Sequence, residues 1–329
     1  MRLSIICILF LMEAAPVWAD TQVRLEQTEQ GVIVRVNDSL FAEYLTRSGR
    51  QPVVWPIMGP TGAAYTRSNP VGPRQEFERE DHPHHRSLWF AHGDVNGFDF
   101  WSNKPKEHAC EILHREFVKL ESDGATATVV TRNDWVASGK KQCEDQRTLV
   151  FGADESARWI DFSIKLMASA GDVTFGDTKE GTFAIRVAGT MKVDSPGQGK
   201  IVNSQGQEDK AAWGQPAEWV DYNGPVQGET VGIAILSHPS NPRHPCKWHV
   251  RTYGLFAANP FGESHFPPGD VHQGELTIPA GEHLTFRYLV VFHRGDQKTA
   301  DIHRRYHSFT QDSTPGVVVP RGSSKRAGR

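Results

Sequence analysis

Apolar and polar residues alternate along much of this chain with a period of two, which is the pattern of strands that bury one face. The clearest segments are residues 32–36, 127–131, 159–166, 182–187, 231–236 and 284–292. The turns between them are rich in Gly, Asp and Pro, and 30 Gly with 20 Pro leave little room for long helices. One helix is predicted, over residues 299–309, because Ile302, Tyr306 and Phe309 would share one face. The chain is therefore predicted to be all-β.

Residues 20–311 contain no Pro/Ser-rich linker that would divide them into separate domains. We therefore predict a single domain, a large two-sheet antiparallel β-sandwich with one short C-terminal helix. After residue 311 the composition shifts toward Ser, Gly, Lys and Arg, so residues 312–329 are predicted to be a disordered basic tail.

The amino terminus has the organisation of a secretory signal peptide. Met1 and Arg2 precede an apolar run over residues 3–12, and Ala19 offers a small residue for cleavage. No later segment approaches the ~20 apolar residues of a membrane-spanning helix. We expect residues 1–19 to be removed and the mature protein to be exported, periplasmic or secreted, without insertion into the membrane.

The formal net charge is −3, so the chain lacks the broad basic field that would meet the phosphates of a nucleic acid. Export would leave Cys110, Cys143 and Cys246, an odd number that permits at most one internal disulfide. Cys110 and Cys143 flank neighbouring strand candidates and are the favoured pair, but spacing alone does not establish the bond. The oligomeric state is left open.

Four of the 15 histidines fall within residues 81–94, beside several aromatic residues. Imidazole suits proton transfer or metal ligation near neutral pH, so this stretch is predicted to line a functional site. In an extended chain His82 and His84 would point to one face. His84 and His92 are candidate proton donors. Candidate substrate contacts in this block are Arg86, Asp94, Asn96 and Trp101. The alternatives are a divalent metal held by His82, His84 and His92, and a structural polar network between loops.

A second polar and aromatic block covers residues 237–254, and the predicted strand 231–236 delivers it to its position. Arg243 and Arg251 could hold a carboxylate or sugar hydroxyls through their planar donor forks. The alternative is a proline-stiffened loop whose polar side chains satisfy backbone carbonyls. From this block His244 is a candidate acid–base group. The candidate substrate contacts are Asn241, Arg243, His249 and Tyr253.

Residues 179–186 offer the best candidate for a catalytic carboxylate. Glu180 stands just before a predicted strand, where a raised pKa would make it a general base or acid. Arg186 is a candidate substrate contact from the same segment. An ion pair between Glu180 and Arg186, with a structural role, is the equally weighted alternative.

Five segments of the chain together resemble one family. They are residues 82–97, 180–186, 238–245, 253–262 and 292–295. These segments are similar to the signature of bacterial exported proteins labelled "methane oxygenase PmoA", a family of unassigned function. The resemblance implies a large sandwich similar to galactose mutarotases, a galactose-mutarotase-like supersandwich, and a role in sugar processing. The label does not fix the reaction, because membrane oxygenase subunits have several transmembrane helices and the predicted mature chain has none.

The pattern and the resemblance favour an exported carbohydrate-active enzyme that uses His/Glu acid–base chemistry, as an epimerase, lyase or hydrolase. The two histidine-rich blocks are expected to face each other across one cleft. Its expected partner is a small-molecule or glycan substrate, and no cofactor is required. One alternative is a non-catalytic glycan-binding module. The other is a metal-dependent oxygenase, with a divalent metal as cofactor, as the family label suggests.

Overall fold

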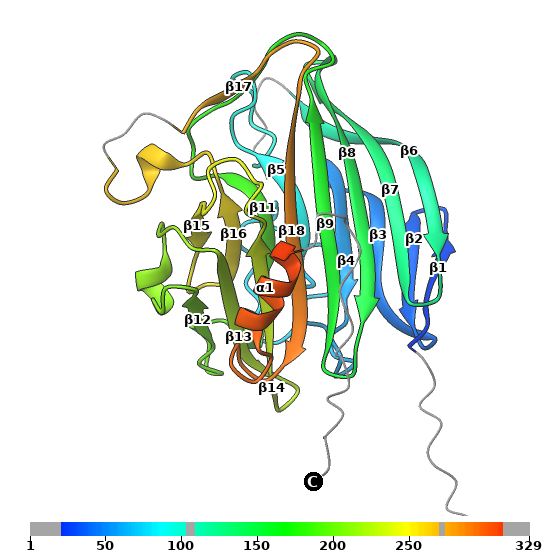
Figure 1. The fold of residues 1–329 in the computed structure, drawn as a ribbon, viewed down its shortest axis with the longest axis vertical. Coiled ribbons are helices and arrows are strands. Elements are labelled where there is room, and N and C mark those ends of the chain that lie inside the picture. Colours follow the sequence, from blue (N-terminus) through cyan, green and yellow to red (C-terminus); the bar gives the residue numbers. More distant parts are fainter. Residues whose placement is uncertain (1–20, 103–108, 270–273, 312–329) are drawn as a thin grey trace, which may run out of the picture.

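The computed structural model describes residues 21–102, 109–269 and 274–311. The predicted signal peptide and the predicted basic tail lie outside these residues. Two large antiparallel sheets of eight strands each face one another, and a short helix lies near the carboxyl end (Figure 1). The predicted all-β sandwich is therefore confirmed.

The first sheet has the strand order β1-β2-β3-β4-β5-β11-β16-β15. Its strands are β1 (Val23–Gln27), β2 (Gly31–Val36), β3 (Ser39–Ser48), β4 (Gln51–Ile57), β5 (Leu88–His92), β11 (Gly181–Arg186), β16 (Leu255–Asn259) and β15 (Lys247–Val250). The neighbours β5, β11 and β16 are far apart in the sequence, so this end of the sheet joins three distant segments of the chain (Figure 1).

The second sheet has the order β12-β13-β14-β18-β9-β8-β7-β6. Its strands are β12 (Lys200–Asn203), β13 (Trp219–Val226), β14 (Glu229–Ser237), β18 (His283–Arg294), β9 (Ala157–Met167), β8 (Lys140–Ala153), β7 (Thr126–Ala137) and β6 (Cys110–Ser122). The shorter elements are β10 (Val173–Phe175), β17 (Leu276–Ile278), η1 (Gly189–Met191), η2 (Asp209–Ala212), η3 (Glu263–His265) and α1 (Ile302–Gln311). Every segment predicted from period-two alternation lies on a strand, except that Val187 falls just after the end of β11.

The core lies between the two sheets and is rich in aromatic rings. Phe90 of β5 contacts Phe162 of β9 and Phe286 of β18, with ring centroids 6.4 Å apart in both pairs. Phe183 of β11 stacks on Phe162 at 4.5 Å. Burying an aromatic side chain of this size contributes roughly 1.5–3 kcal/mol, so these contacts are a main source of stability.

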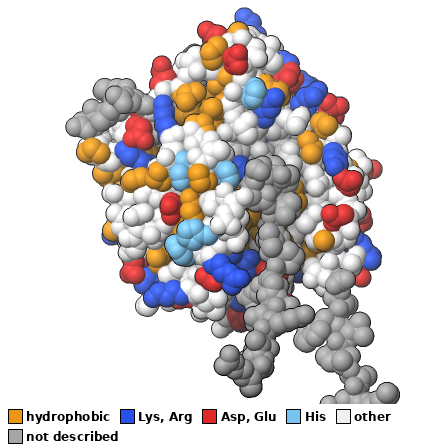
Figure 2. Space-filling view, viewed as in Figure 1, with side chains coloured by type: hydrophobic (Ala, Val, Ile, Leu, Met, Phe, Trp, Pro, Cys, Tyr) orange, Lys and Arg blue, Asp and Glu red, His pale blue; other side chains and the backbone are white. Residues whose placement is uncertain are grey.

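Helix α1 covers the outer face of the second sheet (Figure 1). The predicted helix 299–309 is confirmed, but it begins at Ile302, three residues later than expected. Ile302, Tyr306 and Phe309 are buried against β13, β14, β9 and β18 as the periodicity predicted. On the molecular face that carries α1, acidic and basic side chains are interspersed, and histidines lie among hydrophobic side chains (Figure 2). With ten residues, α1 is far too short for a membrane span, and no other helix of the described residues qualifies.

The predicted disulfide between Cys110 and Cys143 is wrong. Cys110 lies on β6 and Cys143 on β8, and β7 separates these strands. Two strand spacings amount to about 9–10 Å, beyond the ~7 Å that Cα atoms of a disulfide tolerate. Both residues are buried thiols, as is Cys246.

Candidate functional site

The strands β5 and β11 are buried on both faces, and one of these faces points away from the core between the sheets. Phe90 and Phe183 both contact Phe162 in the second sheet, so they point inward. Successive side chains of a strand point to opposite faces. The neighbours Trp89 and Ala184 therefore point outward, away from the second sheet.

One residue from each of four strands forms a row across this outer face. Trp89 of β5 is paired with Ala184 of β11, Ala184 with Ala257 of β16, and Ala257 with His249 of β15. Three strand spacings put Trp89 and His249 about 14 Å apart. The row therefore has large rings at its two ends and two small methyl groups between them.

Further aromatic rings border both ends of the row. Trp101 lies 5.2 Å from Trp89 between ring centroids, and His85 stacks on Trp89 at 5.4 Å. At the other end Trp213 lies 6.4 Å from His249, and both contact Phe266. Of these rings, Trp213 is half-buried and the rest are buried.

Five polar atoms of this region have no hydrogen-bond partner among the described residues. They are Nε1 of Trp89, Trp101 and Trp213, Oγ1 of Thr182 and Nδ1 of His249. We call these five residues the outer-face cluster; Thr182 belongs to it because it lies beside the inward Phe183 on β11. A buried polar atom without a partner costs roughly 1–3 kcal/mol and is uncommon in native proteins. Five within one region favour a site whose ligand supplies the missing partners.

His85 is held beside the cluster as a neutral hydrogen-bond donor. Its Nδ1 lies 2.9 Å from NH1 of Arg186. Because a guanidinium only donates, Nδ1 accepts and the ring proton sits on Nε2. Burial, with the nearby His84 and Arg186 charges, lowers the pKa of His85 well below its ordinary value of 6.5. The ring is therefore neutral, with its N–H at a fixed position.

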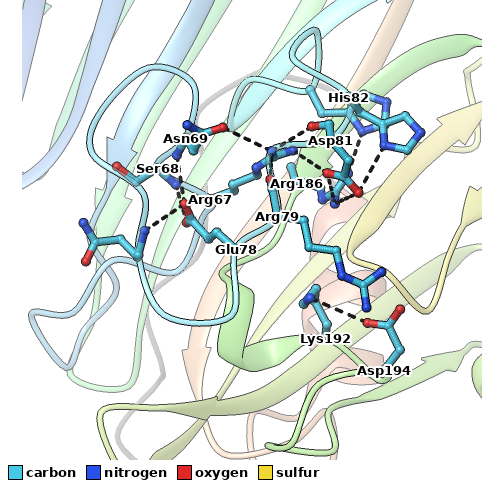
Figure 3. Close-up of polar contacts among 12 residues, drawn as sticks. Arg67, Ser68, Asn69, Glu78, Arg79, Asp81, His82, Arg186, Lys192 and Asp194 are labelled. Carbon is cyan, nitrogen blue, oxygen red and sulfur yellow. Dashed lines mark hydrogen bonds and ion pairs between the residues drawn. The ribbon is translucent and has the colours of Figure 1, made fainter.

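Two buried arginines share one carboxylate next to His85, and we call Arg67, Asp81 and Arg186 the arginine node (Figure 3). Asp81 Oδ1 lies 3.0 Å from Arg186 NH2 and 3.2 Å from Arg67 NH1. Burial raises the pKa of Asp81, but the two arginines and His82 outweigh it and lower the pKa below 3.8. Asp81 is therefore ionised and orients both guanidinium groups.

His82 and Tyr253 complete the exposed side of this region. Their rings stack at 5.2 Å with an angle of 6°, and His82 also stacks on His85 at 4.8 Å. Arg186 lies over the Tyr253 ring, with Cζ 4.8 Å from its centroid. Tyr253, predicted from the second block, thus meets the first block here.

His82 and His84 lie in a loop, so the same-face geometry of an extended chain does not apply to them. Residues 81–85 form a turn in which the His85 N–H donates to the His82 carbonyl at 2.9 Å. The two rings nevertheless lie 5.7 Å apart, and His84 contacts His85 and Trp101. Proline at position 83, which cannot donate to a ladder, agrees with this loop.

His92 points inward, opposite to the outer-face cluster. It is fully buried against Phe175 and Phe261, and its Nε2 donates to the Gly176 carbonyl at 2.8 Å. Burial lowers its pKa to about 4. Within the described residues no group of three or more His, Cys, Asp or Glu side chains is arranged to hold a metal. The structure therefore does not assemble His82, His84 and His92 into a ligand set.

Three predicted substrate contacts, Asp94, Asn96 and Arg86, make hydrogen bonds to residues outside the outer-face cluster. Asp94 accepts the Gly97 N–H, and Asn96 accepts the Thr174 N–H at 2.8 Å. Arg86 donates to Ser48 Oγ at 2.9 Å. These contacts belong to the turn after β5, to β10 and to the end of β3.

Most of the second block does not face the first block across a cleft. Asn241 donates to the Arg287 carbonyl, and Arg243 donates to the Pro260 and Glu275 carbonyls. His244 is hydrogen-bonded to the Tyr306 hydroxyl of α1 at 3.2 Å. The predicted contact of the two blocks is therefore limited to its downstream end, which supplies His249 and Tyr253.

Glu180 is half-buried and lies directly before β11. Its carbonyl accepts the Gly93 N–H at 2.7 Å, which ties the Glu180 segment to the end of β5. Its carboxylate acts electrostatically on Tyr253, among the causes of the raised pKa of that phenol. No ion pair joins Glu180 to Arg186; the Arg186 guanidinium pairs with Asp81 instead.

An open surface hollow of about 670 Å³ lies at the opposite edge of the first sheet, between β1 and the β6–β7 turn. It is lined by residues such as Gln22, Arg24, Glu121 and Asp123. It contains no histidine and none of the unpartnered polar atoms, so its chemistry does not favour a site.

Several residues of the site were missed by sequence reasoning, namely Arg67, Asp81, His85, Trp89, Thr182 and Trp213. Trp89 lies in a strand that is buried on both faces, so period-two alternation does not assign its side. The sequence does place His85 in a group of three histidines. Only its contact with the arginine node distinguishes it from His84.

Comparison with known proteins places the chain in a family. None of the curated proteins matches it significantly. A family model described as a family of unknown function, DUF6807, matches residues 31–307. The matched span runs from β2 into α1 and includes the outer-face cluster and the arginine node. The chain therefore belongs to the DUF6807 family of unknown function.

Proposed function

We propose that this chain is an exported carbohydrate-active enzyme whose sugar substrate binds on the outer face of β5, β11, β16 and β15. The observation that carries the proposal is the outer-face cluster, with its five unpartnered polar atoms among aromatic rings. Sugar hydroxyls both donate and accept hydrogen bonds, so one ring could satisfy several of these atoms. The half-buried His84, Trp213 and Tyr253 border the region and would form its entrance.

The floor of the row suits a sugar ring because Ala184 and Ala257 lie between Trp89 and His249. Indole rings offer the flat apolar faces on which sugar C–H groups stack, while their N–H groups donate to hydroxyls. The resemblance to exported proteins labelled "methane oxygenase PmoA" and to galactose mutarotases supports the same substrate class and an extracytoplasmic location.

The neutral His85 favours a reaction in which negative charge develops on a substrate oxygen. A neutral imidazole N–H stabilises such an oxyanion by hydrogen bonding without a full positive charge. In epimerisation, one of Glu180 and His84 would take a proton from the carbon next to a substrate carbonyl, and the other would return a proton to the opposite face of that carbon. This combination supports epimerisation more than elimination or hydrolysis, because both of those expel a leaving group whose oxygen must receive a proton.

The two alternative functions, glycan binding without catalysis and metal-dependent oxygenation, predict different experimental results. A non-catalytic glycan-binding module would use the same rings and donors, but it would release its ligand unchanged. A metal-dependent oxygenase has no specific observation in its favour among the described side chains. Product analysis after incubation with sugars separates an enzyme from a binding module.

In an enzyme, His85→Gln should lower turnover at least about 100-fold.

Substitution Thr182→Val tests the site directly. Because the Thr182 hydroxyl has no partner, its removal should leave the free energy of unfolding unchanged or raise it by about 1 kcal/mol. The same substitution should weaken sugar binding roughly fivefold to tenfold, since a ligand hydrogen bond is lost. Denaturant unfolding and a fluorescence titration, which exploits the nearby tryptophans, measure the two effects.

Thr131→Val is the matched control. Thr131 is equally buried, but its hydroxyl is hydrogen-bonded to His114 Nδ1 at 2.9 Å. This variant should lose stability and keep sugar affinity. Equal loss of stability in both variants, with no change in sugar binding for Thr182→Val, would contradict the proposed site.

A further inference from the structure

Two histidines of α1 lie one helical turn apart on its solvent-exposed side. His303 and His307 are four positions apart, which places their side chains next to each other along the helix. Both residues are exposed. Their rings are perpendicular, with centroids 4.4 Å apart, and the two Nε2 atoms are 3.0 Å apart. The two imidazoles therefore bring their outermost nitrogen atoms together at one point of the surface.

The separation of the two nitrogens matches that of two ligands of one metal ion. Imidazole nitrogens bind first-row divalent metals at about 2.0–2.1 Å. Two ligands at a right angle then lie about 2.9 Å apart, as in the square-planar or tetragonal sites of Cu²⁺, whereas two ligands of a tetrahedral Zn²⁺ lie about 3.3 Å apart. The observed separation of 3.0 Å is closer to the right-angle value.

The spacing of the two imidazoles is fixed because α1 is anchored to the second sheet. Tyr306, which lies between them in the sequence, is buried in the contact with that sheet. In the turn between β8 and β9, Asp154 Oδ2 and Ser156 Oγ accept hydrogen bonds from NH2 of Arg305, at 2.9 Å and 3.1 Å. A metal ion would not have to order the helix, so binding costs little conformational entropy.

The two Nε2 atoms are also chemically suited to a metal. Among the described residues, each imidazole makes a single hydrogen bond, and this bond joins the two Nε2 atoms. One ring donates and the other accepts. When the donating ring takes the tautomer that carries its proton on Nδ1, both Nε2 atoms present a lone pair, and exposed rings can turn toward a common ion. Two coordinate bonds would then replace one neutral hydrogen bond.

We infer that His303 and His307 together bind one divalent transition-metal ion, and that they prefer Cu²⁺ to Zn²⁺. The nitrogen separation suits Cu²⁺, which is also the first-row divalent ion that nitrogen ligands bind most tightly. The described residues offer no third protein ligand, so water completes the coordination. The pair lies on the outer face of the second sheet and the outer-face cluster on that of the first, so the inference is independent of the proposed function.

Calorimetric titration of the chain with CuCl₂, and separately with ZnCl₂, tests the inference. His303→Gln and His307→Gln each remove one ligand and keep an exposed polar side chain, so both variants should fold, as far-UV circular dichroism would verify. We expect each variant to bind one equivalent of Cu²⁺ at least about tenfold more weakly than the unaltered chain, since chelation by two ligands at a fixed spacing is lost. The unaltered chain should bind Zn²⁺ more weakly than Cu²⁺.

His283→Gln is the matched control, because it removes an exposed histidine at the start of β18. This variant should bind Cu²⁺ with the stoichiometry and affinity of the unaltered chain. The same stoichiometry and affinity in His303→Gln and His307→Gln would overturn the inference, as would an unaltered chain that binds no Cu²⁺. Zn²⁺ binding as tight as that of Cu²⁺ would overturn the preference for copper. None of these results bears on sugar binding, which tests the proposed function separately.

Discussion

Buried histidines are held neutral at several positions of this molecule. Burial lowers the pKa of His92 to about 4 and that of His249 to about 3, from an ordinary value of 6.5. For His92 the backbone hydrogen bond to Gly176 opposes this effect without reversing it. Each ring must therefore take up a proton when the chain unfolds in mildly acidic solution.

Stability should fall on acidification, and His92 accounts for one part of the fall. Its unfolded form binds a proton below pH 6.5 and its folded form only near pH 4, so the contribution is complete above pH 6.5 and is lost as the pH falls toward 4. The loss is on the order of 2–3 kcal/mol. Denaturant unfolding at pH 7.0 and 4.5 measures it.

His92→Gln should reduce that pH dependence by the His92 contribution, because the amide can donate to the Gly176 carbonyl but does not titrate; His85 and His249 keep the remainder. His303→Gln, on the exposed surface of α1, serves as the control and should keep the slope of the unaltered chain. An unchanged slope in His92→Gln would show that other groups cause the acid sensitivity.

At the level of single residues, the sequence did not distinguish between neighbouring histidines. His84 was favoured over His85, yet His85 is the ring that Arg186 holds by a hydrogen bond. The reason is that residue 186 comes from another strand, so only tertiary contact distinguishes neighbouring histidines. Trp101 and Tyr253 were predicted, because an aromatic side chain in a polar loop is visible in the sequence itself.

Among the elements, α1 is the one whose role is clearest from its contacts. It presents Ile302, Tyr306 and Phe309 to an apolar patch of the second sheet. Arg287 lies over the Phe309 ring, with Cζ 4.8 Å from its centroid, and is paired with the buried Asp161. A short helix is marginal in isolation, so this packing supplies most of its stability.

Ile302→Ala should lower the free energy of unfolding by about 2–4 kcal/mol, because the residue is fully buried and its removal leaves a cavity. Urea unfolding followed by circular dichroism measures the change. Arg304→Ala, at an exposed position of the same helix, should change stability by less than about 0.5 kcal/mol. Similar losses in both variants would argue against docking of α1 through its apolar face.

Strand prediction succeeded where one face of a strand is polar and failed to assign faces where both are buried. Segment 159–166 shows alternation in its sequence and lies on β9. All five residues of β5 are buried, so its sequence carries no periodic signal. The face that Trp89 occupies follows only from the pairing of β5 with β11 and from the contacts of Phe90.

At the scale of the whole molecule, the order of strands in the sheet determines whether two cysteines can form a disulfide. Cys110 and Cys143 are close in the sequence of strands but lie on β6 and β8, with β7 between them. Burial raises the pKa of the Cys246 thiol to about 12, so it is unreactive in the folded protein.

A reducing agent should therefore leave the thermal unfolding temperature of the chain unchanged. Labelling with a thiol reagent in denaturant should modify Cys110, Cys143 and Cys246 together, while the folded protein reacts slowly. Mass spectrometry of the labelled protein measures both. A shift of several degrees on reduction, or loss of two labelled thiols, would reveal a disulfide after all.

The sequence alone determined the all-β class, the two-sheet sandwich and the C-terminal helix, because periodicity and turn residues are local properties. It also indicated which segments are rich in histidine, arginine and aromatic side chains. Only the tertiary structure decided that His92 faces the core, that His244 docks on α1, and that His85 and Arg186 meet. Those outcomes depend on which strands are neighbours, and pairing of segments some 70 to 100 residues apart is set by the packing of the whole core.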